Sequence, residues 1–279
     1  MSEPRVLFVT SNRIGDCVIS SGVIREIGRQ LPGARITVAC GRPPAPFFRS
    51  APGVERVIIL DKKKFAGHWI ALWKQVWRTR WDMVVDIRGS ALAFQVRAKT
   101  RRVYHRGLET GLPKVETVTR LMQAERTLDP ELFIDDRARA EAAAVIDPQL
   151  ATGPGPILAL APIAHQPGKS WPADRWGALV EKLKAEPRFD GWRFMLIGGP
   201  GDHPPAAPAL AAAGRPTLGL FGPTEWWLYG PWGAKTRTVA SNETRGQFAP
   251  IEALTVEHVF EAVLGLHDAF IGGSGAVKP

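Results

Sequence analysis

The fold is decided by the stretch RVLFVTSNRIGD at residues 5–16. Its apolar run, Val6 to Val9, is typical of a buried strand, and it breaks into a polar turn with Gly15 and Asp16 before a helical pattern begins. This order places Asp16 near a helix N-terminus, at the carboxyl end of a strand in a parallel sheet. Ligands of open α/β sheets bind outside those strand ends, so Asp16 is a candidate catalytic base. The alternative is that Asp16 only caps the helix.

The first half of the chain alternates between strand and helix patterns. Apolar runs bounded by turn residues predict strands, and apolar residues at helical spacing predict helices. The predicted strands cover residues 5–10, 35–40, 57–60, 83–87 and 102–105, and the predicted helices cover 18–31, 69–80 and a segment after Ser90. Such alternation favours an α/β fold with a parallel sheet and helices on both faces.

The second half repeats this organisation. Gly153 to Pro156 has the composition of a linker, so we predict an N-terminal domain at 1–152 and a C-terminal domain at 153–279. The predicted strands of the second domain cover 157–160, 194–197 and 217–221, with helices at 173–185 and near 206–213. Each strand ends in a glycine or proline loop, which indicates two Rossmann-like domains that face each other across a cleft.

The composition is that of a globular protein. With 279 residues, of which 45% are hydrophobic and 23% charged, the chain is long enough for two cores of ordinary size. Glu3, Arg5, Arg13 and Asp16 interrupt the N-terminal region, which excludes a secretory signal there and predicts a cytoplasmic protein.

The chain has two cysteines, Cys17 and Cys40, and both are flanked by apolar residues of predicted strands and helices. This setting favours reduced, buried thiols over a disulfide or a metal site. The sequence therefore predicts no metal.

The net charge of +9 at pH 7 indicates an anionic partner. Nucleic acid, phosphorylated substrates and acidic lipid surfaces all carry the required charge. The basic residues are concentrated at Lys62 to Lys64 and from Arg97 to Arg106. The sequence contains no RNA-binding aromatic signature, zinc-finger spacing or basic zipper, which disfavours nucleic acid.

Glycine loops at strand ends let backbone N–H groups approach a phosphate. Gly198 to Gly201 and Gly222 are suitable, but no G-x-G-x-x-G follows the first strand of either domain, which disfavours a dinucleotide oxidoreductase. The P-loop pattern is also missing, because Gly168-Lys169-Ser170 lacks its upstream glycine. Lys169 precedes a predicted helix, where its ammonium could meet a diphosphate; the alternative is an ordinary surface lysine.

Several short motifs occur together in a recognisable order. They are Ile14 to Asp16, Asp82 to Ser90, Pro162 with Pro167, Lys169 to Pro172, Gly198 to Asp202 and Leu220 to Thr224. Over about residues 5–265 the chain resembles the heptosyltransferases of glycosyltransferase family nine. The resemblance implies a GT-B architecture and a metal-independent, inverting transfer of heptose from ADP-heptose to the inner core of lipopolysaccharide, with no cofactor besides the nucleotide-sugar donor.

The resemblance also implies roles for residues of the C-terminal domain. Lys169 matches the residue that pairs with the donor diphosphate, and Gly222, Pro223 and Thr224 match a loop beside it. Asp202 falls at the acidic position near the nucleoside, and Gly199 lies in the preceding glycine loop. Where the family commonly has His-Pro-Gly-Ala-Ser, this chain ends the motif with His165, whose imidazole could donate to phosphate.

For the N-terminal domain the resemblance implies that Asp16 takes the proton from the acceptor hydroxyl. The candidate acceptor-binding residues lie near predicted strand ends: Arg13, Gly15, Arg88, Arg101 and Arg102. The acceptor of such an enzyme, a lipopolysaccharide core or lipid A precursor, offers sugar carboxylates and phosphates, which suit guanidinium groups.

The chain departs from the family between Asp202 and Thr217. Only residues 203–216 stand where the family has two further strand and helix pairs, so the C-terminal domain is predicted to be shortened. Three hypotheses remain: an active sugar transferase with an unusual donor site; a catalytically dead relative that binds anionic glycolipid or nucleotide; and an unrelated basic nucleotide-binding Rossmann protein.

Trp69, Trp73, Trp77 and Trp81 recur every four residues, with Lys74, Arg78 and Arg80 between them. A helix with these residues could lie on an anionic membrane, at the inner face of the cytoplasmic membrane. The alternative is a helix that buries its tryptophans against the sheet.

A second aromatic group, Trp226, Trp227 and Trp232, follows the loop at Gly222. It could stack on a base or a sugar, or cover the loop.

Overall fold

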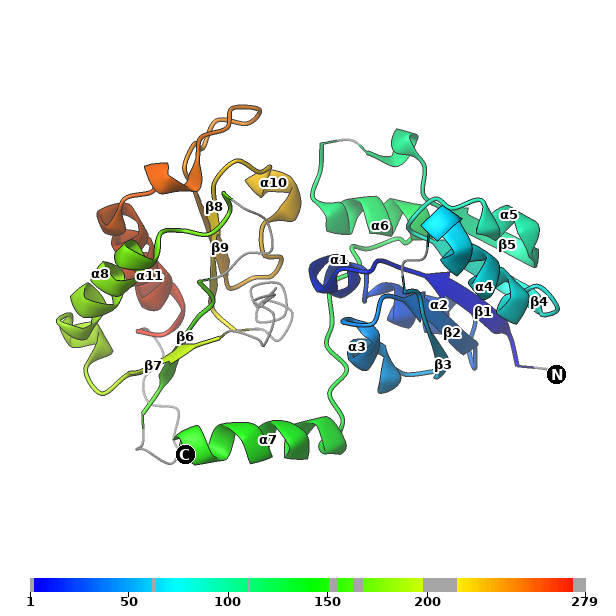
Figure 1. The fold of residues 1–279 in the computed structure, drawn as a ribbon, viewed down its shortest axis with the longest axis horizontal. Helices are drawn as coiled ribbons and strands as arrows, with labels where there is room; N and C mark the ends of the chain where they lie inside the picture. The colour runs from blue at the N-terminus through cyan, green and yellow to red at the C-terminus, as the bar shows by residue number, and fades with distance from the viewer. Residues whose placement is uncertain are drawn as a thin grey trace. The chain divides into compact units, whose positions relative to one another are not determined.

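The computed structural model describes residues 3–61, 64–109, 111–150, 155–162, 168–197 and 215–272, without side-chain detail at 145–150. The chain forms two compact units, unit 1 at Met1–Arg139 and unit 2 at Ala140–Pro279 (Figure 1). The division lies within helix α7 (Asp136–Leu150). Part of the predicted linker lies outside the described residues, and the domain boundary at 152–153 stays a prediction.

Unit 1 is built on one sheet of five parallel strands in the order β3-β2-β1-β4-β5. The strands are β1 (Arg5–Val9), β2 (Arg35–Cys40), β3 (Val54–Ile59), β4 (Arg80–Asp86) and β5 (Arg97–Val103). The apolar run around Val6 forms the central strand, because its side chains are buried on both faces of the sheet. The predicted α/β fold with a parallel sheet is confirmed.

Helices cover both faces of this sheet. They are α1 (Ile14–Ile19), α2 (Val23–Gln30), α3 (Ala45–Arg49), α4 (Gly67–Val76), α5 (Leu92–Gln95) and α6 (Lys114–Met122), with short 3₁₀ turns η1 (Lys64–Ala66) and η2 (Arg106–Leu108). Side chains of β1 alternate between two cores: Phe8 packs with residues of α1, α2, α3 and α6, and Leu7 packs with residues of α4 and α5.

Three local predictions for unit 1 were wrong. The helix expected at 18–31 is divided into α1 and α2 at Ser20 to Gly22. A methyl group at Gly22 would lie 2.6 Å from the carbonyl oxygen of Asp129. The backbone at Asp129 can therefore pack this closely against the start of α2 only because residue 22 is a glycine. The strand expected at 102–105 is β5, which begins earlier. Trp81 lies on β4 and not on the helix, and it is buried.

Unit 2 contains two pairs of parallel strands, β6 with β7 and β8 with β9. The strands are β6 (Ile157–Leu160), β7 (Arg193–Leu196), β8 (Thr217–Phe221) and β9 (Thr236–Ala240), and the helices and 3₁₀ turns are α8 (Ala173–Lys184), η3 (Pro187–Phe189), α10 (Trp226–Tyr229), η4 (Ile251–Ala253) and α11 (Val256–Phe270). Strand β9 was not predicted. The helix expected near 206–213 lies outside the described residues.

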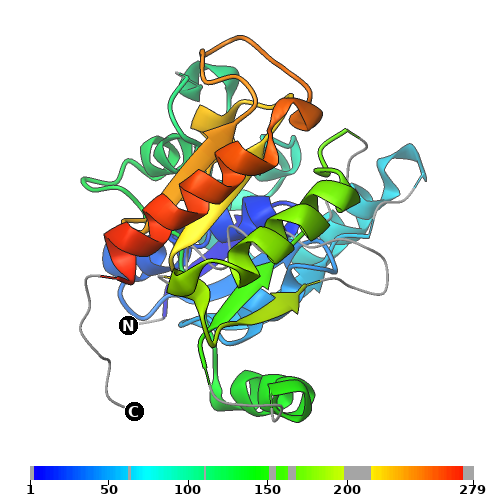
Figure 2. The ribbon, with the colours of Figure 1, turned by 90° about the vertical axis from the view of Figure 1, so that its left-hand side faces the viewer.

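Helices α8 and α11 lie side by side in front of these strands (Figure 2). One apolar core joins both strand pairs to the helices. Leu158 and Phe194 come from the first pair, Leu218 and Val239 from the second, and Leu179 from α8. Unit 2 therefore has a core of its own.

The thiols of Cys17 and Cys40 are free and buried, as predicted. Burial raises the pKa of Cys40 to about 12 and raises that of Cys17 further. Among the described residues, no helix has both the length and the apolar character needed to cross a membrane.

Replacement of Phe8 by Ala should lower the free energy of unfolding by about 3–5 kcal/mol, because the ring is fully buried in the centre of the sheet and packs edge-on against Phe48. Urea denaturation measures the change. The matched control is Phe94→Ala, whose ring is 68% exposed and should change stability by less than about 0.5 kcal/mol. Equal losses in the two variants would contradict the assigned core.

Candidate functional site

The candidate site of unit 1 lies where the sheet changes direction. The chain proceeds from β1 to β2 and β3 on one side, and from β4 to β5 on the other. The loops that follow β1 and β4 therefore diverge at the carboxyl edge of the sheet, which is the position where open α/β sheets bind ligands. Asp16 belongs to the first loop and helix, and Arg88 belongs to the second loop.

Asp16 occupies the first turn of α1, immediately after β1. The hydroxyl of Ser11 donates a hydrogen bond of 2.9 Å to Oδ2 of Asp16, and the carboxylate is half-buried. The N-cap residue of α1 is Arg13, and the helix has no side-chain cap hydrogen bond. The capping alternative for Asp16 is thus wrong. One oxygen of its carboxylate is held by the Ser11 hydroxyl.

The loop after β4 is organised by Asp86, which is fully buried at the end of the strand. Its carboxylate accepts hydrogen bonds from the backbone N–H of Arg88 at 2.8 Å, from the backbone N–H of Ser90 at 3.0 Å and from the Ser90 hydroxyl. Burial is the largest influence and raises the pKa of Asp86 above its ordinary value.

Gly89 completes this turn. It has a φ of 63°, in the left-handed region that favours glycine, and a methyl group there would lie 2.6 Å from the carbonyl oxygen of Tyr104. The backbone position of Arg88 is fixed by these contacts.

The guanidinium of Arg88 joins the two loops. Its Nη1 donates to the side-chain oxygen of Asn12 at 3.3 Å, and its carbon lies 4.9 Å from the centre of the Trp69 ring. Asn12 follows β1 by three residues, so this contact brings the loop of Asp16 and the loop of Arg88 together. A cation held on the loop that also carries Asp16 can bind an anionic group of a substrate.

The other predicted acceptor residues of unit 1 are placed differently. Arg13 is exposed at the start of α1, and Gly15 lies within α1. The guanidinium of Arg101 donates to the carbonyl oxygens of Ala93, Val96 and Ala98, so its donors hold α5 against β5. Arg102 points to the opposite face of β5, and its buried Nε has no hydrogen-bond partner.

In unit 2, the segments after β6 and β8 meet at the turn η4. The indole N–H of Trp171 donates to the carbonyl oxygen of Leu254 at 2.9 Å, and Arg175 donates to the same oxygen. A methyl group at Gly222 would lie 2.6 Å from the backbone nitrogen of Ile251. The loop of Lys169 and the loop of Gly222 are thereby held against one short segment.

Lys169 is half-buried just before α8, and Gly168 before it has a φ of 76°. Pro223 is exposed, and the N–H of Thr224 bonds to the carbonyl oxygen of Gly222 at 2.8 Å. The N-terminal end of α8 and the Gly222 loop thus contact the same segment, and a helix N-terminus suits a phosphate.

His165, Gly199 and Asp202 lie outside the described residues, as do Lys62 and Lys63.

The second aromatic group flanks the Gly222 loop. The ring of Trp227 is stacked on that of Phe248, with 6.3 Å between the ring centres, and it meets Trp226 edge-on. The indole nitrogen of Trp226 is buried without a hydrogen-bond partner. These contacts favour a covering role for Trp226 and Trp227.

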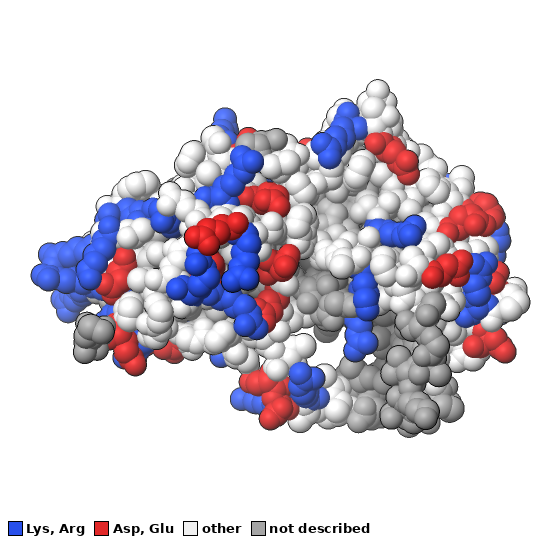
Figure 3. Space-filling model, turned by 180° about the vertical axis from the view of Figure 1, so that it is seen from behind, with Lys and Arg blue, Asp and Glu red and all other residues white. Residues whose placement is uncertain are grey.

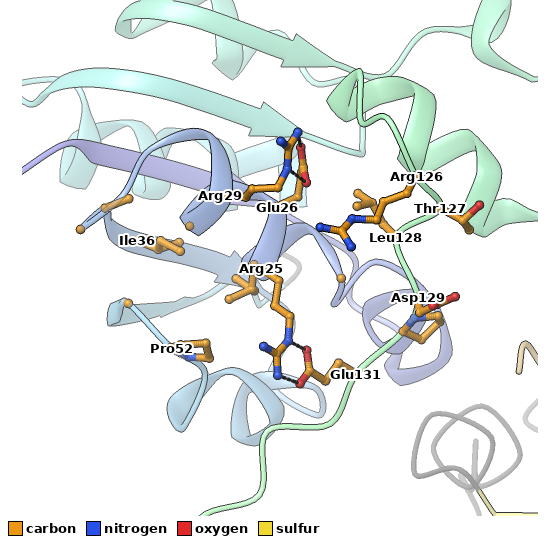
Figure 4. A pocket seen from close by; sticks show the side chains of 17 residues that line it. Arg25, Glu26, Arg29, Ile36, Pro52, Arg126, Thr127, Leu128, Asp129 and Glu131 are labelled. Carbon is orange, nitrogen blue, oxygen red and sulfur yellow. Dashed lines mark hydrogen bonds and ion pairs between the residues drawn. The ribbon is translucent and has the colours of Figure 1, made fainter.

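Two cavities of unit 1 were not predicted. One of about 780 Å³ lies along α2, and Figure 4 shows Arg25 paired with Glu131 and Arg29 paired with Glu26 at its wall. These ion pairs neutralise most of its charge. A second of about 800 Å³ lies between α4 and α5 and includes Arg88 in its lining.

Sequence reasoning also missed the supporting residues Ser11, Asn12, Asp86 and Ser90. The available signals were the motif from Asp82 to Ser90, which contains Asp86 and Ser90, and the place of Ser11 and Asn12 just after an apolar strand. No group of three His, Cys, Asp or Glu side chains able to hold a metal ion occurs in the described part of the chain.

Comparison with protein-family models gave no match, and no curated protein matched. Solved structures do match. A glycosyl transferase of family 9 from Veillonella parvula has a TM-score of 0.77 and 15% identity, and the match covers 95% of this chain and 98% of that one.

Two E. coli structures are also similar. The ADP-heptose lipopolysaccharide heptosyltransferase II has a TM-score of 0.69 and 16% identity, with 94% of this chain and 98% of that one covered. The heptosyltransferase WaaC with ADP has a TM-score of 0.66 and 17% identity, with 94% and 99% covered. These similarities confirm the predicted GT-B type of fold.

The raised pKa of Asp86 predicts a pH dependence of stability. The folded protein keeps this proton at pH values where the unfolded chain, with a pKa near 3.8, has released it. The contribution of Asp86 to stability therefore falls as the pH rises above 3.8 and levels off above the folded-state pKa.

The Asp86→Asn variant has no such proton. As the pH rises from 3.8 to above the folded-state pKa of Asp86, the free energy of unfolding of wild type should fall relative to that of this variant. Urea denaturation of both proteins measures the difference. A difference that stays constant, or that grows in favour of wild type with rising pH, would contradict the assignment.

Proposed function

We propose that the protein is a glycosyltransferase that transfers a sugar from a nucleotide-diphosphate donor, with Asp16 as the catalytic base. The observation that carries the proposal is the half-buried carboxylate of Asp16, held by Ser11 at the carboxyl edge of the sheet, on the loop that Asn12 joins to Arg88. The glycosyltransferase fold of the whole chain supports it.

In the proposed reaction, Asp16 removes the proton of an acceptor hydroxyl as that oxygen attacks the anomeric carbon of the donor sugar. The bond from this carbon to the diphosphate breaks, and the diphosphate leaves with the electron pair. Attack from the face opposite to the leaving group inverts the anomeric centre. No metal ion is needed in this scheme.

The negative charge of the leaving diphosphate must be stabilised by the protein. We assign this role to the ammonium of Lys169 and to the N-terminal end of α8, and we propose that the loop from Gly222 to Thr224 lies beside the diphosphate. His165 and Gly199 are proposed to contact the phosphates, and Asp202 the ribose hydroxyls.

For the substrates, we propose a heptose donor such as ADP-heptose and an acceptor from the lipopolysaccharide core or a lipid A precursor. One E. coli structure with this fold is that of a heptosyltransferase with ADP, which supports a nucleotide-sugar donor. Arg88, with its guanidinium at the edge of the site, suits a carboxylate or phosphate of the acceptor. An acceptor of this kind would bring the protein to the inner face of the cytoplasmic membrane.

The Asp16→Asn variant should lose sugar transfer by a factor of about 10² to 10⁴, because an amide cannot accept the proton. Its affinity for ADP should stay unchanged, since Asp16 is not assigned to the donor. Transfer is measured as ADP release from ADP-heptose in the presence of a lipid A precursor, and affinity by calorimetry. A variant as active as wild type would exclude Asp16 as the base.

The Lys169→Ala variant should bind ADP about tenfold more weakly or worse, since it loses a charged hydrogen bond to the diphosphate. Lys184→Ala is the matched control, because Lys184 lies at the C-terminal end of α8, away from the loop of Lys169, and pairs with Glu181. Calorimetry with both variants compares the two lysines. If ADP binds equally to Lys169→Ala and wild type, the donor loop has been assigned incorrectly.

A further inference from the structure

Four large apolar side chains lie exposed on η1, α4 and α5 of unit 1. They are Phe65 at 98% exposure, Ile70 at 57%, Trp77 at 38% and Phe94 at 68%, and we name them the α4 surface. Single exposed apolar residues are common on proteins, but a group on adjoining elements marks an interaction site.

The four residues belong to one continuous region. Phe65 and Ile70 border the 800 Å³ cavity between α4 and α5. Trp77 is stacked on Trp73, with 5.4 Å between the ring centres, and the indole N–H of Trp73 donates to the carbonyl oxygen of Gln95, next to Phe94. The α4 surface therefore extends along the whole of α4 and reaches α5.

The backbone at Phe65 and Ala66 supports a function for this region. Their φ angles are 52° and 57°, in the left-handed region that bulky side chains rarely adopt. The Phe65 ring is almost fully exposed, so packing within unit 1 does not compensate for this conformation. Strained conformations of this kind are found mainly at functional sites.

The segment of chain that carries the α4 surface is strongly positive. Residues 62–108 contain twelve Lys and Arg but only two acids, whereas the whole chain has a net charge of +9. Asp86 is buried, and Asp82 is paired with Lys99. Figure 3 shows Lys and Arg side chains gathered at the left edge of the view, on unit 1. The excess positive charge of the protein is thus located in this segment.

Several of these cations are exposed on the same elements as the apolar side chains. Lys64 precedes Phe65, Lys74 lies on α4, and the guanidinium of Arg78 lies 5.0 Å from the centre of the Trp77 ring. Exposed aromatic and aliphatic side chains together with Lys and Arg on one helix are typical of helices that lie on anionic lipid. Protein interfaces, in contrast, are depleted in Lys.

We propose that the α4 surface docks the protein on an anionic lipid bilayer. Phe65, Ile70, Trp77 and Phe94 enter the interface between headgroups and acyl chains, and Lys64, Lys74 and Arg78 contact the lipid phosphates. This docking requires neither Asp16 nor Lys169, and it is therefore independent of the proposed sugar transfer. The cavity between α4 and α5 connects the docked surface to Arg88.

Co-sedimentation with vesicles tests the proposal. The full chain should bind vesicles that contain phosphatidylglycerol and should bind pure phosphatidylcholine vesicles weakly, with binding to the anionic vesicles decreasing as salt rises. Ile70→Glu and Phe94→Glu should each reduce binding about tenfold or more, since a carboxylate is expelled from the interface and repelled by the lipid phosphates. The double variant Lys74→Glu, Arg78→Glu should also lose binding.

The control variants place the same change on other exposed apolar residues. Phe248→Glu and Ile134→Glu, at positions 52% and 48% exposed, should bind vesicles as wild type does. Thermal melts check that each variant is folded, which is expected for the vesicle-binding variants and their controls because each of those substituted side chains is exposed. Asp16→Asn and Lys169→Ala should also bind normally, which separates a failure of this proposal from a failure of the proposed function.

Three outcomes would overturn the docking proposal. Wild type could fail to bind anionic vesicles. The Phe248 and Ile134 variants could lose as much binding as the Ile70 and Phe94 variants. Ile70→Glu could instead dissociate an oligomer, seen by size-exclusion chromatography, with vesicle binding unchanged, which would assign the α4 surface to contact between copies of the chain.

Discussion

The pairing of β1 with β4 is the contact on which the candidate site depends. In its register Val9 lies opposite Asp86, so the two strands end at the same level of the sheet. The loops that follow the two strands therefore begin side by side, and they meet through Asn12 and Arg88. A slip of one residue would turn Asp86 toward the other face, and the loop of Arg88 would lose the carboxylate that fixes it.

Local sequence patterns were sufficient for most of the central strands. The runs at β1, β2, β6 and β8 are apolar and bounded by turn residues, and the structure has strands at these positions. The division between α1 and α2 could not be predicted in this way. It depends on Gly22 meeting the backbone of Leu128 and Asp129, more than a hundred residues later in the chain. Strand β9 was missed because its sequence, TRTVA, lacks a long apolar run.

The candidate site was predictable only in part, because residue type and position along the chain do not fix where a side chain's donors are directed. Arg88 and Arg101 both lie near strand ends, yet Arg88 joins two loops whereas Arg101 bonds to the carbonyl oxygens of Ala93 and Val96. Asp86 looked like part of a strand, and only its burial and three donors reveal that it holds the loop. In unit 2, Trp171 in the loop of Lys169 and Gly222 in its own loop both contact the segment at η4, which no motif contains.

Helix α4 links the two proposed activities through its periodicity. Leu72 and Val76 are buried against the sheet, Trp69 and Trp73 pack on the same core, and Ile70 and Trp77 are seven residues apart on the exposed side. The tryptophan stripe is therefore mainly a packing stripe, and the exposed residues between its members form the α4 surface. Since the ring of Trp69 lies under the guanidinium of Arg88, the packing that exposes this surface also positions the cation of the candidate site. A rotation of α4 by one residue, about 100°, would remove both features together.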